Sequence, residues 1–212
     1  MMTLEERKKK VNILLKKLKT LIPKAKMMLA YSNNWELVVA VALSAQCTDK
    51  QVNKVTQKLF QKYPTLHDYV DADIIEFEQD IYSTGFYKNK AKNVLAGAKV
   101  VRELFGGNIP KTIEELILIP GVGRKTANVV LGNAYGITEG IAVDTHVKRF
   151  AKNFGLTDSS NPDLIERDLM EILPQKEWFS FTYYAIEYGR QFCSARCRHE
   201  NCPLREYVFT LK

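Results

Sequence analysis

Two closely spaced glycines lie between apolar stretches in residues 116–127, which read LILIPGVGRKTA. This pattern predicts a short helix, a tight turn and a second helix. Gly121 and Gly123 can take positive φ angles and let another backbone come close, and the second helix begins with unpaired N–H groups at the positive end of its dipole. We therefore predict that Gly121, Val122, Gly123 and Arg124 form an anion site that fits a DNA phosphate without reading sequence. The alternative is an ordinary helical hairpin with a glycine turn.

Lys125 falls in the first turn of that second helix. There the helix dipole and the neighbouring Arg124 both disfavour a charged ammonium, and an uncharged amine is a nucleophile. An amine that attacks the sugar carbon carrying a base could expel the base, leave a Schiff base and then permit elimination of the 3′ phosphate. Taken alone, Lys125 could equally be one more phosphate contact.

Asp144 ends the small apolar run IAVD of residues 141–144 and precedes a helical stretch, so helix capping alone would explain it. The catalytic interpretation needs this carboxylate near the same sugar. There it would stabilise positive charge on the ring and move protons to and from Lys125. Two residues later, His146 could contact a phosphate or simply complete the turn, and both interpretations remain open.

The composition is typical of a soluble globular protein with a polyanionic partner. Of 212 residues, 46% are hydrophobic and 26% are charged, and 31 Lys and Arg against 24 Asp and Glu give a net charge of +7. This surplus favours a nucleic acid without identifying it. No apolar run approaches the roughly 18 residues that a membrane span needs, and none follows the N-terminal charges as in a secretory signal. We expect no membrane association and a cytoplasmic location.

Helical periodicity runs along the whole chain and strand-like alternation is almost absent, so we predict an all-α fold. The expected helices are one opened by the box Thr3 to Glu6, Trp35 to Ser44 capped by Asn34, one opened by Thr48 and Gln51, Asp73 to Tyr82, Lys88 to Phe105, Thr112 to Leu118, one from Arg124, Thr145 to Asn153, one capped by Asn161, and a last one carrying aromatics from Trp178 to Tyr188. We expect those aromatics to pack in the core. Crossing points near Trp35 and Tyr135 indicate two lobes, one built from both chain ends.

Several segments, in this order, resemble the helix-hairpin-helix DNA glycosylases and most of all the endonuclease III family. They are LSAQCTD (43–49), STGFYKNKA (83–91), IPGVGRKTANVV (119–130), VDTH (143–146) and YGR (188–190), and they cover nearly the whole chain. The resemblance implies a two-lobed all-α fold, with a six-helix barrel over 27–138 and a second helical lobe from 1–26 and 139–212. It also implies a monomeric enzyme that removes oxidised pyrimidines from damaged double-stranded DNA and nicks the abasic site by β-elimination.

Carried over by position, Lys125 matches the Schiff-base lysine of the family and Asp144 its essential aspartate. Gln46 and Phe86 match loop residues that fill the gap left by a flipped base, although the family often has an aliphatic residue at the position of Phe86. Extrusion of a base costs a few kcal/mol of stacking, which such a wedge can partly offset.

The C-terminal cysteines depart from the family pattern. Members with a four-iron four-sulfur cluster use four cysteines separated by six, two and five residues. Here Cys193, Cys197 and Cys202 are separated by three and four residues, and Val208 stands where the last ligand is expected. We therefore expect that the cluster is lost and that no cofactor is bound. The alternative is a site of three cysteines and His199 for an iron–sulfur cluster or zinc. We expect Cys47, beside Gln46, to be a buried free thiol.

The sequence also has features of three other functions. A mismatch adenine glycosylase is disfavoured, because that branch of the family lacks the hairpin lysine and carries an extra C-terminal domain. A glycosylase of altered specificity, acting on mismatched thymine or only on abasic sites, is a closer alternative. A non-catalytic helix-hairpin-helix module that grips phosphates is the rival of another class, and Asp144 in its matching context disfavours it.

Overall fold

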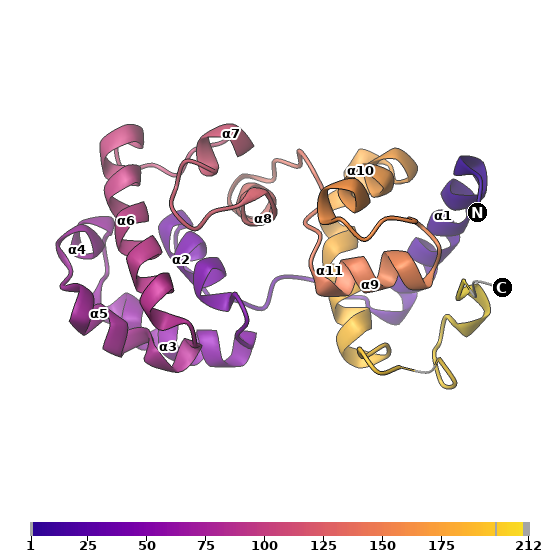
Figure 1. Ribbon diagram of the computed structural model, residues 1–212, viewed down its shortest axis with the longest axis horizontal. Coiled ribbons are helices and arrows are strands. Elements are labelled where there is room, and N and C mark those ends of the chain that lie inside the picture. Colours follow the sequence, from indigo (N-terminus) through magenta and orange to yellow (C-terminus); the bar gives the residue numbers. More distant parts are fainter. Residues whose placement is uncertain (1, 198, 210–212) are drawn as a thin grey trace. The chain divides into compact units, whose positions relative to one another are not determined.

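The computed structural model describes residues 2–197 and 199–209, and over these residues every regular element is a helix, with no strand. The prediction of an all-α fold is therefore confirmed. The chain divides into two compact units: Met1–Met27 with Thr138–Lys212 forms one, and Met28–Ile137 forms the other (Figure 1). None of the helices in these residues is long and apolar enough to cross a membrane.

The central unit, Met28–Ile137, is built around the buried helix α2. Its helices are α2 (Asn34–Ser44), α3 (Asp49–Lys62), α4 (Leu66–Asp71), α5 (Ile74–Ile81), α6 (Tyr87–Phe105), α7 (Ile113–Leu116) and α8 (Arg124–Tyr135), with a 3-10 turn over Tyr82–Thr84. Helix α2 is apolar nearly all round and packs against α3, α6 and α8, while α4 and α5 pack on α6 (Figure 1). A helix that is apolar all round belongs in a core, so α2 forms the centre of this unit.

The unit formed by both chain ends contains α1 (Leu4–Leu21), α9 (Thr145–Asn153), α10 (Pro162–Ile172), α11 (Gln175–Gln191) and a 3-10 turn over Arg205–Tyr207. Helix α11 packs against α9 and α1, and α10 packs against α1 and α9. Phe181, Ala185 and Tyr188 of α11 are fully buried, while Trp178 and Tyr184 pack against the same core. The expected core role of these aromatics is confirmed.

Several expected helix ends differ from the structure. Asn33, not Asn34, caps α2, because Asn33 Oδ1 accepts the backbone N–H of Glu36 while Asn34 is already helical. Helix α6 starts at Tyr87, one residue before the predicted Lys88. Helix α7 ends at Leu116 instead of Leu118, because the chain then tightens into turns in which the N–H of Leu118 donates to Glu115 O. Helix α4 was not predicted, although Thr65 and Asp68 form a complete capping box before it.

Candidate active site

The hairpin between α7 and α8 forms as predicted, but its two glycines serve different purposes. Gly121 has φ +82°, and a Cβ there would lie 2.9 Å from Asn93 Cβ. Gly123 has φ −94°, so Gly121 alone of the two uses the positive φ that both glycines allow. A Cβ at Gly123 would meet nothing within 4 Å, so here glycine leaves open space in front of α8. Val122 between them is buried and anchors the turn.

The start of α8 carries the predicted amine in an accessible position. Gly123 is the N-cap residue and no side chain caps the helix. Arg124 and Lys125 are the first two helical residues, and both are exposed. Ala127, Val130 and Leu131 are fully buried and hold the helix against the core of the central unit. A rigid helix therefore presents Lys125 to solvent beside backbone N–H groups that have no partner within the helix.

Gln46 and Phe86 lie in two loops that the fold brings to the hairpin. Both have positive φ, +54° and +49°, which is uncommon for residues with side chains, and Phe86 is 63% exposed. Both line a pocket of about 190 Å³ together with Gly121 of the hairpin and with Asn89, Lys90 and Asn93 of α6. Three of the sequence segments singled out above thus meet around one pocket of the central unit.

Lys90 holds the two loops together, and sequence reasoning missed it. Its side chain is only 7% exposed, and Nζ donates to Leu43 O at the end of α2 and to Thr84 O before Phe86, both at 2.8 Å. Burial lowers the pKa of Lys90, while the nearby Cys47 opposes that shift. Its position on the buried stripe of α6, four residues before Val94, could have signalled an inward-facing lysine. Cys47 is half-buried, so the expectation of a buried thiol there is wrong.

Asp144 is the N-cap of α9 in the other unit, as expected. Its Oδ1 accepts the backbone N–H groups of His146 and Val147, both at 2.8 Å, and the residue is half-buried. Oδ2 accepts no hydrogen bond from the residues that the structure describes. One oxygen therefore fixes the carboxylate and the other is available for an outside group, so capping and chemistry are compatible at this residue.

His146 is tied into its own unit. Its Nδ1 lies 3.0 Å from an Arg149 guanidinium nitrogen, and the ring sits so close to Gly189 of α11 that a Cβ there would lie 2.3 Å from Nδ1. Burial lowers the pKa of His146, and the charge of Arg149 acts in the same direction while Asp144 opposes it. Since a guanidinium only donates, Nδ1 accepts this bond and Nε2 is the nitrogen left for another partner.

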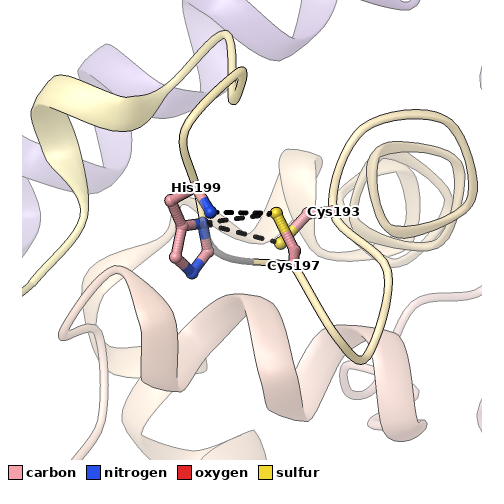
Figure 2. A group of neighbouring side chains, drawn as sticks. All are labelled: Cys193, Cys197 and His199. Atoms are coloured by element: carbon pink, nitrogen blue, oxygen red, sulfur yellow. Dashed lines mark hydrogen bonds between the residues drawn. The ribbon is translucent and has the colours of Figure 1, made fainter.

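Near the C-terminus, Cys193, Cys197 and His199 form a group that could bind a metal, with ligand atoms all within 4.8 Å of one another (Figure 2). The sulfurs of Cys193 and Cys197 lie 3.9 and 3.8 Å from His199 Nδ1. Cys202 does not belong to this group, because its sulfur lies 2.6 Å from Tyr188 Oη. The group therefore contains Cys193, Cys197 and His199 of the alternative four-residue site, but not Cys202.

Comparison with known proteins identifies the family. The model of the HhH-GPD superfamily of base excision DNA repair proteins matches residues 39–175. Endonuclease III of Synechocystis is 50% identical over 179 residues, 84% of this chain and 82% of the relative. Endonuclease III of Bacillus subtilis is 46% identical over 198 residues, 92% of this chain and 90% of the relative. The chain belongs to the endonuclease III family. It is therefore an enzyme of base excision DNA repair, a DNA glycosylase and abasic-site lyase.

Solved structures give the same result for this endonuclease III family member. A trapped covalent intermediate of endonuclease III with DNA matches with a TM-score of 0.91 and 41% identity, covering 98% of this chain and 96% of that one. A non-covalent endonuclease III–DNA complex matches with a TM-score of 0.92 at the same identity and coverage. A thermostable thymine-DNA glycosylase has a TM-score of 0.80 at 20% identity, which shows a shared fold alone.

Proposed function

We propose that this enzyme removes oxidised pyrimidines, such as thymine glycol, from damaged double-stranded DNA and then cuts the abasic strand by β-elimination. The observation that carries the proposal is an exposed lysine amine, Lys125, in the first turn of a helix that no side chain caps. The solved endonuclease III that was trapped covalently on DNA supports a covalent route in a protein with 41% identity to this one.

In the proposed complex, the start of α8 binds a DNA phosphate. The first N–H groups of the helix and the open space before Gly123 suit an anion that approaches along the helix axis. Gln46 and Phe86 then occupy the gap that the flipped base leaves in the stack, which offsets part of the cost of unstacking. Phe86 is exposed and held in a left-handed conformation, so its ring is available for that contact.

The chemistry begins when Lys125 Nζ forms a bond to C1′ and the base leaves with the electron pair of its glycosidic bond. Opening of the sugar ring gives a Schiff base between the lysine and C1′. Loss of a proton from C2′ then breaks the C3′–O bond and releases the 3′ phosphate. Water hydrolyses the Schiff base and returns the amine. Asp144 stabilises the positive charge on the sugar and carries protons to and from Lys125, with Oδ2 as the available oxygen.

Lys125 and Asp144 belong to different units of the chain, and the proposal requires both to reach one deoxyribose. We further propose that residues 27–138 act as the barrel lobe with the hairpin, and that 1–26 with 139–212 act as the lobe supplying Asp144 and, through Nε2 of His146, a phosphate contact. A cytoplasmic location, action as a monomer and loss of the four-iron four-sulfur cluster are parts of the same proposal.

The test uses duplexes that contain thymine glycol, an abasic site or a mismatched thymine, with borohydride added to trap a Schiff base. We expect cleavage and a trapped adduct with thymine glycol and with the abasic site. Lys125→Ala should give no adduct, while Lys99→Ala, at an exposed lysine of α6, should behave as the wild type. Cleavage of the abasic duplex alone would favour an abasic-site lyase, and preference for the mismatch would favour a thymine glycosylase. Binding without any cleavage would favour a DNA-binding module.

A further inference from the structure

The C-terminal residues do not fit the four-iron four-sulfur cluster that the family resemblance implies. In a cubane cluster each protein ligand binds a different iron, so the ligand atoms surround the cube and are held far apart. Here the donor atoms of Cys193, Cys197 and His199 all lie within 4.8 Å of one another, which leaves no room for a cube between them. Val208, at the position of the expected fourth ligand, has no donor atom.

The same three side chains fit a single ion. Zinc binds thiolate sulfur at about 2.3 Å and imidazole nitrogen at about 2.0–2.1 Å, so two such ligands on one tetrahedral ion are about 3.5 Å apart. The sulfurs of Cys193 and Cys197 lie 3.9 and 3.8 Å from His199 Nδ1, within a few tenths of an ångström of that separation. Figure 2 shows the three side chains pointing toward one another from a single stretch of chain. We propose that Cys193, Cys197 and His199 bind one Zn²⁺ ion.

Two N–H groups contact the two sulfurs. The backbone N–H of His199 donates to Cys197 Sγ at 3.3 Å, and Asn153 Nδ2 of α9 donates to Cys193 Sγ at 3.7 Å. Such N–H contacts orient the side chain of a metal ligand. A turn in which the N–H of Cys197 donates to Ser194 O brings the second sulfur back toward the first. His199 has φ +61°, and its Nδ1 lies 3.9 Å from Cys193 Sγ and 3.8 Å from Cys197 Sγ.

The ion would fasten the C-terminal segment to the helix that carries Asp144. Arg149 of α9 donates from Nε to Cys193 O at 3.2 Å, and its terminal nitrogen contacts His146 Nδ1. Farther along the chain, the N–H of Phe209 donates to Asn153 O at 2.7 Å. The ligand loop is thus connected to α9 at several points, and a single Zn²⁺ would stabilise that packing in place of a cluster.

The first test measures metal content, and it is independent of the proposed reaction. Protein purified without a metal-chelating tag or column should contain about one zinc per chain, with neither iron nor acid-labile sulfide. Cys197→Ser and His199→Ala should lose the zinc, whereas Cys47→Ser, at a thiol in the other unit, should keep it. Brown protein containing iron and sulfide would overturn the proposal, and so would zinc that both ligand variants retain.

A second measurement covers variants that fold poorly. Wild-type protein stripped of metal under reducing conditions should take up Co²⁺ and develop visible absorption with a thiolate charge-transfer band. His199→Cys should still bind Co²⁺ but with a stronger thiolate band, because a third sulfur replaces the imidazole. Adding Zn²⁺ should raise the thermal midpoint of the stripped wild type and leave that of Cys197→Ser unchanged. Stripped wild-type protein that shows no spectrum with Co²⁺ and no shift with Zn²⁺ would refute the site.

Discussion

Helices α8 and α9 begin in opposite ways, and each start carries one of the two residues proposed for catalysis. Helix α8 begins after Gly123 with no capping side chain, and its second residue is the exposed Lys125. Helix α9 begins after Asp144, whose Oδ1 accepts two of the first N–H groups of its own helix. An uncapped start keeps its N–H groups for an outside anion, whereas a capped start fixes the carboxylate that caps it. The start of α8 therefore suits an outside anion, which we propose to be a DNA phosphate, whereas the start of α9 suits a fixed carboxylate.

Replacing Lys125 should have the largest effect, because it removes the nucleophile from the open helix start. We expect Lys125→Gln to abolish both base excision and borohydride trapping, while the free energy of unfolding stays within about 0.5 kcal/mol of wild type because the site is exposed. Duplex binding, measured by fluorescence anisotropy, should persist because the backbone N–H groups remain. Trapping that survives in this variant would assign the nucleophile to another amine.

Replacing Asp144 tests whether the capped start does chemistry as well as capping. Asp144→Asn keeps an oxygen for the N–H groups of His146 and Val147, so thermal stability should hardly change. Single-turnover excision of thymine glycol should nevertheless fall by about 10²–10⁴-fold, the range typical of a lost proton-transfer group.

Asp144→Ala is the matched comparison, since it removes the cap and the charge together. It should show the same loss of excision, with unfolding easier by about 0.5–2 kcal/mol in denaturant titrations. An asparagine variant with full activity would reduce Asp144 to a structural cap.

Much of this arrangement could be predicted from the sequence, and the exceptions have physical reasons. The turn of the hairpin, the start of α8 and the cap of α9 depend on local signals, a glycine turn and an Asp before an amphipathic stretch, so these were predicted at the right residues. The conformation of Gly123 was not, because glycine allows positive φ without requiring it. Lys90 was missed because its two acceptors come from Leu43 and Thr84, which only the folded chain brings together.

The C-terminal ligand set also could not be predicted from the sequence alone. Spacing alone could not decide which of the cysteines stands with His199. The structure separates them, because Cys202 lies against Tyr188 Oη while Cys197 turns back to Cys193 and the histidine. Ligand sets are properties of three-dimensional geometry, and the sequence supplies only the candidates.

We expect Gly123 to matter for DNA binding and Gly121 for stability, so replacing each glycine tests one of these two roles. Gly123→Ala adds a methyl group where no protein atom lies within 4 Å, so stability should be nearly unchanged. DNA affinity should weaken by about tenfold, or ~1.4 kcal/mol, because the methyl group obstructs the phosphate.

Gly121→Ala should do the reverse. Its φ of +82° and the clash with Asn93 should cost about 1–3 kcal/mol of stability, measured by thermal unfolding. Equal affinity loss in both variants, after correction for the folded fraction, would remove the reason to place the phosphate at Gly123.

Helix α6, like α8, starts without a side-chain cap, directly after the exposed Phe86. Lys90 holds this region in place, as Asp144 does at the start of α9. It donates hydrogen bonds to Leu43 O and Thr84 O, just before the loops that carry Gln46 and Phe86. Lys90→Met keeps the shape of the side chain but leaves both carbonyls without that donor, at a cost of about 1–3 kcal/mol. Excision should fall only a few-fold, because the nucleophile and the carboxylate are untouched.

A double-mutant cycle separates this positioning role from plain destabilisation. If Lys90 acts by holding the loops, Gln46→Ala should reduce excision less in the Lys90→Met background than in wild type, because a loosened loop has already lost part of its benefit. Lys92→Met, at an exposed lysine of the same helix, is the matched control and should leave the effect of Gln46→Ala unchanged. Additive effects of Lys90→Met and Gln46→Ala would mean that the buried lysine supports only the core. The hydrogen bonds of Lys90 would then have no role in positioning the loops for DNA.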